Sequence, residues 1–304
     1  MSSSKKPQSQ RTPWERMQHP VSKPRQAFTV TLGDRGENEA GMQMIGQDAG
    51  KGVSVEHLRN CKASLDAVGV SSHVYDLGEL LEGVVDADKF APAAVLVVKG
   101  GVAHFLKEMG DDAEAKVLAE LESMPKDKQT FSYGQVRNKH ARHNNTMGDF
   151  DQEPDIANGK GTVVNFKDYP YMDKMRRVAS AWVDAPFPLV GELNDYYDAN
   201  TCGIGWHGDL ERKLVVGMRV GPGANGMPLK YQWFHRSSPV GREAQIVLDS
   251  GDLYMMSEKA VGFDWKLPSK YTLRHAAGKA SCSYSKTKRK RDDPEHEVVV
   301  WRPV

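Results

Sequence analysis

The sequence predicts an α+β protein in which a small region of mixed helix and strand precedes a β-sandwich or jelly roll. After residue 125, six strand-like segments follow one another, and Gly, Pro, Asn and Asp separate them. One segment with helical spacing, residues 171–183, interrupts this run. Before residue 125, helical and strand-like segments alternate instead. Many short strands with regular turns are typical of a sandwich or jelly roll, whereas alternation is typical of an α/β layer.

Composition places the chain among globular proteins that work in a reducing compartment. The 304 residues are 39% hydrophobic, which is enough for a packed core, and the longest apolar run, residues 91–98, is too short to cross a bilayer. The three cysteines are widely spaced, which favours neither a disulfide framework nor a Cys-x-x-Cys zinc site. The net charge of +1 gives no overall basic field that would attract nucleic acid.

Composition and periodicity divide the chain into three parts. Residues 1–26 are rich in Ser, Gln, Pro and Lys and are expected to form a disordered basic arm. Residues 27–124 are expected to form an α/β domain of unknown role, with strands at 28–32 and 93–98 and helices at 55–68 and 113–121. Residues 125–304 form the strand-rich domain. Its expected strands are residues 162–166, 213–220, 229–234, 244–248, 253–256 and 271–275.

A histidine and an aspartate two residues apart, His207 and Asp209, indicate a metal site. Residues i and i+2 of a strand point to the same face, so both side chains can reach one ion. A jelly roll pairs strands that are distant in sequence, so a late strand should supply a third ligand, and His275 fits this position. His235 is the rival, and His296 ranks lower because charged residues surround it. Two histidines and one carboxylate with an open opposite face are the ligand set of non-haem Fe(II) oxygenases.

The segment Tyr-Asp-Ala-Asn-Thr-Cys-Gly-Ile-Gly-Trp-His-Gly-Asp-Leu-Glu-Arg, residues 197–212, resembles the metal-binding segment of AlkB-like Fe(II)/2-oxoglutarate dioxygenases. Four further segments, at residues 136–144, 159–166, 251–260 and 272–278, are similar to AlkB-like proteins of algae and large DNA viruses. The resemblance covers about half of the chain, residues 131–278. It implies a double-stranded β-helix (jelly roll) oxygenase domain over residues 125–304, in which His207, Asp209 and His275 bind Fe(II).

The resemblance also implies that a tyrosine upstream of the metal ligands contacts the co-substrate 2-oxoglutarate. The family places an asparagine two residues before this tyrosine, and Asn194 and Tyr196 keep that pair. Tyr197 is closer to the ligands, but Asp195 stands in the asparagine's place, and a carboxylate there would repel a dicarboxylic acid. Both tyrosines remain candidates.

A cation should grip the distal carboxylate of 2-oxoglutarate, because a guanidinium donates two parallel hydrogen bonds to a carboxylate. In the family this is an arginine on the strand after the last histidine. Arg289 lies at a family-like distance but in a Lys/Arg run, and Arg302 ends the strand-like residues 298–301. These two rank first. Arg291 and Arg219, the latter on the strand after the metal pair, are further candidates.

The basic segment that contains Arg137, Lys139 and Arg142 is a candidate lid over the substrate, with flanking aromatic residues Phe131 and Tyr133. Such a lid would hold phosphates and stack a base that has been extruded into the site. The plain alternative is a solvated loop. Trp206, beside the first metal ligand, is a further substrate-binding candidate. Glu211 and Arg212 are expected to lie on a solvent-exposed turn.

By resemblance, the chain is expected to use Fe(II), 2-oxoglutarate and O₂ to hydroxylate, and thereby demethylate, a modified nucleobase in DNA or RNA, as in DNA repair. A protein side-chain hydroxylase with the same cofactors and a non-catalytic jelly-roll binding module are the alternatives. The expected partner is a nucleic acid substrate and not a membrane. An intracellular location in nucleus or cytoplasm is expected, since the basic run at residues 286–291 permits nuclear import.

Overall fold

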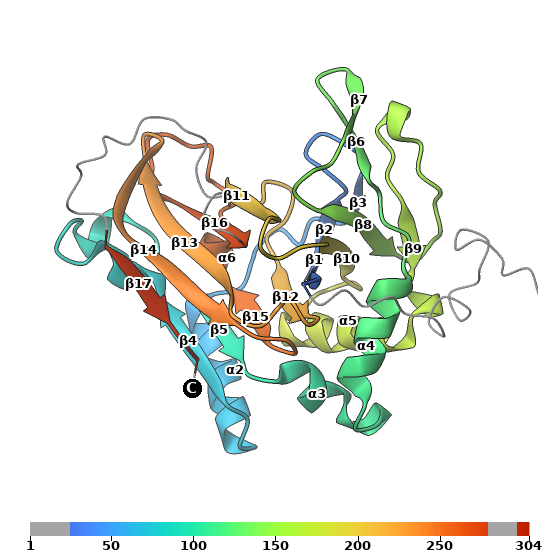
Figure 1. Ribbon diagram of the computed structural model, residues 1–304. Coiled ribbons are helices and arrows are strands. Elements are labelled where there is room, and N and C mark those ends of the chain that lie inside the picture. The colour runs from blue at the N-terminus through green and yellow to red at the C-terminus, as the bar shows by residue number, and fades with distance from the viewer. Residues whose placement is uncertain (1–24, 279–296, 304) are drawn as a thin grey trace, which may run out of the picture.

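The computed structural model describes residues 25–278 and 297–303 as two β-sheets and a layer of helices (Figure 1). The larger sheet has eight strands, in the order β4 (Ser72–Asp76), β5 (Ala94–Val98), β15 (Leu253–Met256), β12 (Val215–Val220), β1 (Ala27–Gly33), β10 (Val190–Tyr196), β8 (His143–Gly148) and β9 (Val163–Asn165). The smaller sheet has five, in the order β11 (Gly203–His207), β16 (Thr272–Gly278), β13 (Met227–His235), β14 (Ser238–Leu248) and β17 (Val298–Trp301). Only the pairs β8–β9 and β14–β17 are parallel among the strands of these two sheets.

Helices cover one face of the larger sheet. They are α2 (Val55–Ala67), α3 (Gly101–Leu106), α4 (Ala113–Ser123) and α5 (Pro170–Trp182). Alternate residues of β1, such as Phe28 and Val30, point to this side and join one buried apolar cluster with Leu58 of α2 and Val117 of α4. The period of two in the strand thus supplies one wall of the core and the helices supply the other.

The opposite face of the larger sheet packs against the smaller sheet. Val215 and Tyr254 from the larger sheet share a second buried cluster with Tyr231, Trp233 and Leu273 from the smaller one. Polar residues of the larger sheet also face the smaller sheet, because they alternate along each strand with the apolar residues that face the helices. The candidate site lies at this interface between the sheets.

Smaller elements complete the structure. Two hairpins, β2 (Arg35–Glu37) with β3 (Met44–Gly46) and β6 (Gln129–Ser132) with β7 (Gln135–Asn138), form two-stranded sheets of their own (Figure 1). A short helix, α6 (Glu258–Val261), follows β15. The 3-10 helices are η2 (Leu77–Leu81), η3 (Ala87–Lys89), η4 (Lys107–Met109), η5 (Ile156–Asn158) and η6 (Phe166–Asp168). Within the described residues, none of the helices has the length and apolar content needed to cross a bilayer.

The expected α+β class agrees with the structure at the level of a mixed protein rich in antiparallel strands. The expected division into residues 27–124 and 125–304 is not reflected in the sheets, since strands from both ranges form the larger one. In particular, β1 lies between β10 and β12 and pairs with both. Pairing between distant strands leaves no mark on local periodicity, which is why the sequence suggested a boundary. The expected arm lies almost wholly outside the described residues.

Candidate metal centre

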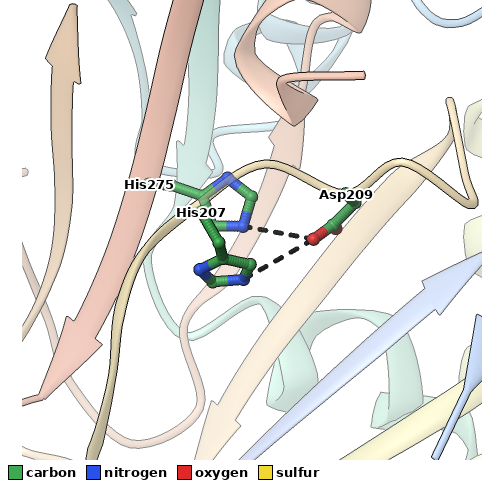
Figure 2. Close-up of side chains that lie close together, drawn as sticks. All are labelled: His207, Asp209 and His275. Atoms are coloured by element: carbon green, nitrogen blue, oxygen red, sulfur yellow. Dashed lines mark ion pairs between the residues drawn. The ribbon is translucent and has the colours of Figure 1, made fainter. Parts of the chain in front are cut away.

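His207, Asp209 and His275 form one group whose ligand atoms all lie within 4.8 Å of one another (Figure 2). Nε2 of His207 is 3.6 Å and Nε2 of His275 is 3.5 Å from Oδ1 of Asp209. Bonds of about 2.1 Å to a shared ion place two ligand atoms roughly 3 to 3.5 Å apart. The group therefore has the spacing of a three-ligand metal site.

Strand pairing and a tight loop bring the three residues together. β11 pairs with β16 in an antiparallel register that sets His207 opposite His275. Asp209 lies in the loop after β11, where its N–H donates to the carbonyl of Val261 at 3.0 Å. A Cβ on Gly208 would stand 2.3 Å from the carbonyl oxygen of Gly262, so only glycine permits this close approach. The loop is thereby held against α6 and directs the carboxylate toward the histidines.

The charge state of both side chains suits metal binding. Burial, together with the neighbouring His275, lowers the pKa of His207 to about 3, so its imidazole is neutral at physiological pH. Burial disfavours the Asp209 carboxylate, but the Arg212 guanidinium and the two histidines together outweigh it and hold the pKa of Asp209 well below its usual range. Nδ1 of His207 lies 2.8 Å from the carbonyl of Gly205, which fixes the ring and leaves Nε2 for an ion.

A buried ionic network supports the carboxylate. Nε of Arg212 is 3.4 Å from Oδ2 of Asp209, and Nη2 contacts Glu211 at 2.6 Å and Glu192 of β10. The Arg212 side chain is 4% exposed and that of Glu211 is 10% exposed. The expected solvent-exposed turn is therefore wrong for these two residues. Their roles become visible only when β10 places Glu192 beside them.

The rival histidines lie elsewhere. His235 ends β13 and stacks on Tyr271 with ring centroids 4.6 Å apart, outside the metal-binding group. His296 lies outside the described residues. The structure thus assembles His275, and not His235, with the His-x-Asp pair.

Of the two tyrosine candidates, Tyr196 faces the interior between the sheets. Tyr196 is buried with Asn194, and Oδ1 of Asn194 accepts a hydrogen bond of 2.5 Å from Nε of Arg142. Tyr197 points away from the interior between the sheets. It stacks on His143, and its hydroxyl donates a hydrogen bond to the carbonyl of His140 at 2.5 Å. The sequence left both open, and the alternation of β10 distinguishes them.

Arg219 of β12 is completely buried and only partly bonded. Nη1 donates to the carbonyl of Met227, whereas Nε and Nη2 have no hydrogen-bond partner. Burial lowers its pKa, which is the effect expected for a cation without a counterion. Gly217 lies two residues before Arg219 on the same face of β12. The Tyr254 ring packs directly on Gly217, since a Cβ on Gly217 would lie 1.9 Å from Cζ of Tyr254. Arg219 therefore faces the smaller sheet beside Tyr254.

Other buried polar atoms at this interface are also unpartnered. They are Oγ1 of Thr29, the hydroxyl of Tyr231 and Nδ1 of His275. Thr29 lies opposite Arg219 in the sheet, and Tyr231 lies opposite His275. Buried polar groups normally have partners, so a group of orphans on two facing sheets indicates the binding place of a polar ligand or of water.

Arg302, one of the two first-ranked arginines, does not reach this place. Arg302 is exposed and follows β17, at the opposite edge of the smaller sheet from β11. Four strand spacings separate the two edges, which is about 19 Å. Arg289 and Arg291 lie outside the described residues. Of the two candidates within the described residues, Arg219 is the one that lies at the interface.

The basic segment expected to act as a lid is partly internal. The Lys139 side chain is 4% exposed and its Nζ bonds to Oδ1 of Asn38 at 2.8 Å, so the expected surface contact with phosphate does not fit. Arg142 is also buried, between Asn194 and Glu39, and burial among these groups replaces the expected exposure. The sequence suggested that residues 137–142 are exposed because Glu39, the acidic residue beside Lys139 and Arg142, comes from a distant segment.

Arg137 and Trp206 keep positions open to a ligand. Arg137 lies on the β6–β7 hairpin and stacks at 5.2 Å on Tyr133, which is 91% exposed at the hairpin tip. Trp206 is half-buried at the end of β11 and packs edge-on against Phe234. Their roles in substrate binding stay predictions.

Comparison with known proteins gives the chain a family. No family model matches the sequence. An uncharacterized protein of Acanthamoeba polyphaga mimivirus is 39% identical over 255 residues, which cover 84% of this chain and 96% of the viral protein. The chain belongs to the family of that viral protein. The match takes in almost all of the viral relative, and because that protein is uncharacterized it assigns no chemistry to this chain.

Proposed function

We propose that the chain is an Fe(II)- and 2-oxoglutarate-dependent oxygenase that hydroxylates a modified nucleobase in DNA or RNA. The group of His207, Asp209 and His275 carries the proposal, because two imidazoles and one carboxylate are the ligand set of this class. The His207 side chain is 27% exposed, so the group is reachable from one side. A structural zinc site would instead have four protein ligands and a closed shell.

The order of the strands supports a double-stranded β-helix. From β10 to β16 the chain passes back and forth between the sheets, and the order β10-β1-β12-β15 faces the order β11-β16-β13-β14. Eight strands wound in this way form a jelly roll. The final strand of such a winding would follow β16 and lie between β10 and β12. In this chain β1, from the other end of the sequence, occupies that place.

The position of β1 explains why the strand between β10 and β12 carries no arginine for 2-oxoglutarate. The residues of β1 are Ala-Phe-Thr-Val-Thr-Leu-Gly, so the strand in the final position has no cation to offer. Arg219 lies next to it on β12, opposite Thr29. We propose that Arg219 grips the distal carboxylate of 2-oxoglutarate.

The free atoms of Arg219 suit this role. Nε and Nη2 form one edge of the guanidinium, and two parallel N–H groups on one edge match the two oxygens of a carboxylate. The Tyr254 hydroxyl can donate as well, since burial raises its pKa to about 12 and keeps it protonated. A bound carboxylate would thus neutralise the charge of the buried Arg219 guanidinium.

The residues of this chain position the reactants and exclude water. When bound, iron and 2-oxoglutarate supply the oxidising chemistry that hydroxylates a C–H bond with O₂. Arg212 keeps Asp209 ionised, and Gly205 fixes the His207 ring. The apolar residues between the sheets keep the interface dry.

A nucleobase substrate is supported by the β6–β7 hairpin. Tyr133 and Arg137 present an exposed ring and a cation at its tip, which are the groups that stack bases and hold phosphates. The resemblance to AlkB-like proteins points to the same substrate class.

The test is succinate formation from 2-oxoglutarate under air, with alkylated single-stranded oligonucleotides, methylated DNA and RNA as substrates. We expect substrate-dependent succinate, lost in His207→Ala and Asp209→Ala and kept in the matched control His235→Ala. Succinate without stimulation by any nucleic acid would favour a protein substrate. No succinate and no iron binding would reject the oxygenase.

A further inference from the structure

A hollow of about 290 Å³ on the outer side of the smaller sheet gathers three cations around a tryptophan. Arg236 comes from the β13–β14 turn, Lys266 and Trp265 come from the loop after α6, and Arg274 comes from β16. We call these four residues the basic pocket. No lining residue is acidic.

The positive charges of Arg236 and Lys266 are not neutralised by nearby carboxylates. Among the described residues, neither Arg236 nor Lys266 has a carboxylate within 4.0 Å. Nζ of Lys266 instead lies 5.4 Å from the Trp265 ring centroid. Like charges around one hollow repel, so an anion in it would be favoured. Since the chain as a whole carries a net charge of only +1, this concentration is local.

Aromatic rings hold the Arg274 guanidinium in a fixed plane. It lies 4.0 Å from the ring centroid of Phe234 and 5.0 Å from that of Trp265. Stacking on two rings fixes the plane of the side chain. A guanidinium that is oriented beforehand loses less entropy when it binds a phosphate.

The backbone that carries Arg236 has an unusual conformation. Arg236 and Ser237 have φ values of 50° and 66°, in the left-handed region that residues with side chains rarely adopt. A two-residue hairpin turn of this type favours Asn and Gly. An arginine at such a position is consistent with a functional reason for its presence.

The basic pocket adjoins the metal centre. Cδ1 of Trp265 would lie 2.7 Å from a Cβ on Gly208, the residue between the two ligands His207 and Asp209. Arg274 precedes the ligand His275 and points to the other face of β16. In Figure 1 the β13–β14 turn and the β6–β7 hairpin both rise at the top of the view, on either side of β11. An extended ligand could therefore contact the basic pocket and the metal centre together.

We propose that the basic pocket binds a phosphate group of a single-stranded nucleic acid, beside the nucleotide on which the metal centre acts. The inference rests on the proposed function for its substrate. Guanidinium and ammonium groups hold the phosphodiester, and the Trp265 ring offers a surface for a neighbouring base. A duplex would present its bases in a stack, where a ring cannot reach them.

Binding of a fluorescently labelled, unmodified single-stranded oligonucleotide, measured by anisotropy at several salt concentrations, tests the proposal without turnover. The double variant Arg236→Ala/Lys266→Ala should weaken binding about tenfold or more at low salt. It should also reduce the slope of log K against log salt by about 1 to 2, since about 0.7 of a counterion is released for each phosphate neutralised on a single strand. Both residues are exposed, so the fold should be unaffected, and thermal unfolding checks this.

The matched control is Lys107→Ala/Lys116→Ala, which removes the same charge from exposed positions on the helical layer. It should leave affinity and slope close to those of the parent protein. Equal affinity and slope in the Arg236/Lys266 variant would overturn the proposal, as would a loss that the control shares. Because succinate formation without nucleic acid does not use the basic pocket, it should persist in this variant. Absence of succinate from the parent protein both with and without nucleic acid, together with no iron binding, would reject the oxygenase and not the pocket.

Discussion

Gly208 shows how one residue sets the geometry of the ligand group. Its missing side chain lets the loop after β11 lie against Gly262, and Asp209 then turns toward the two histidines. The peptide hydrogen bond to Val261 fixes this turn. Asp209 thus reaches His275 although the carboxylate lies beyond the end of β11.

At the same scale, Arg219→Met tests the proposed carboxylate grip. The KM for 2-oxoglutarate should rise about 10- to 100-fold, because hydrogen bonds between charged groups contribute about 1.5 to 3 kcal/mol. Iron binding should be unchanged, since Arg219 is not a ligand. Steady-state kinetics of succinate formation measure the first effect, and anaerobic titration with Fe(II) measures the second.

The unliganded Arg219→Met protein should be at least as stable as the parent, because the substitution removes a buried charge that has no counterion. Arg302→Met is the matched control and should leave the KM unchanged, since Arg302 lies at the far edge of the smaller sheet. A raised KM in the Arg302 variant with a normal KM in the Arg219 variant would reverse the assignment.

The sequence predicts the three proposed metal ligands, but it does not predict how the arginines around them are buried and bonded. His207 and Asp209 are two residues apart, so spacing along the chain finds the pair, although the loop at Gly208 and not a continued strand orients Asp209. Arg219 is a good candidate for binding a carboxylate because two of its nitrogens have no hydrogen-bond partner, and Arg212 can be buried because Glu192 of a different strand pairs with it. Such properties arise from pairing between distant segments, which spacing along the chain does not report.

At the scale of elements, α5 depends on a carboxylate from α4. Glu120 is fully buried and accepts hydrogen bonds from the N–H groups of Tyr171 and Met172 at 3.0 and 2.9 Å. These N–H groups belong to the first turn of α5, where no side chain of the helix itself caps them. Burial nevertheless raises the pKa of Glu120 to about 7.

This raised pKa predicts a pH-dependent stability. The folded protein binds the proton of Glu120 more tightly than the unfolded chain, whose glutamates have a pKa of 4.5. Its contribution to the free energy of unfolding is therefore present below about pH 4.5 and is lost as the pH rises to about 7. The difference of about 2.5 pH units corresponds to a loss on the order of 3 kcal/mol.

Chemical denaturation of the parent protein and of Glu120→Gln between pH 5 and 8 measures this loss. The stability of the parent should fall relative to that of the variant as the pH rises. Glu108→Gln, at an exposed position, is the control and should follow the parent. Parallel curves for the parent and Glu120→Gln would show that the carboxyl does not titrate in this range.

The β6–β7 hairpin gives a second prediction at this scale. Tyr133→Ala and Arg137→Ala should each raise the KM for an alkylated oligonucleotide about 5-fold or more, because stacking of a base on an aromatic ring contributes about 1 to 3 kcal/mol. Succinate formation without nucleic acid should be unchanged. Gln129→Ala, at the base of the hairpin, is the control. An unaltered KM in both variants would remove the hairpin from substrate binding.

Elements with clear periodicity are predictable from the sequence. The helices at 55–68 and 171–183 and the strand at 253–256 match α2, α5 and β15 closely. The sequence does not predict β8, His-Asn-Asn-Thr-Met-Gly, as a strand because its buried residues are mostly polar. Asn144 and Asn145 are buried there because partners such as Asn38 and Pro125 come from elsewhere in the chain. Tertiary hydrogen bonds thus override local propensity.

At the scale of the whole molecule, the two halves of the sequence share one sheet. β1, β4 and β5 come from residues 27–124, and they join β15, β12 and β10 from the second half. The buried clusters on both faces of this sheet also contain residues from both halves. The second half of the sequence, residues 125–304, therefore lacks the strand between β10 and β12 when it is separated from the first half.

This shared sheet predicts that residues 125–304 do not fold alone. Expressed as a fragment, they should show no cooperative unfolding and no binding of Fe(II), whereas the full chain should unfold in one transition. Differential scanning calorimetry and metal titration measure these properties. A fragment that folds and binds iron would show that β1 is dispensable.

The central claim is that His207, Asp209 and His275 hold one iron ion beside a dicarboxylic acid. Anaerobic visible absorption spectroscopy with Fe(II) and 2-oxoglutarate tests it most directly. We predict a charge-transfer band that appears only with both additions, disappears in His207→Ala, Asp209→Ala and His275→Ala, and persists in His235→Ala. A band of unchanged strength in any of the three ligand variants, or no band in the parent protein, would contradict the account.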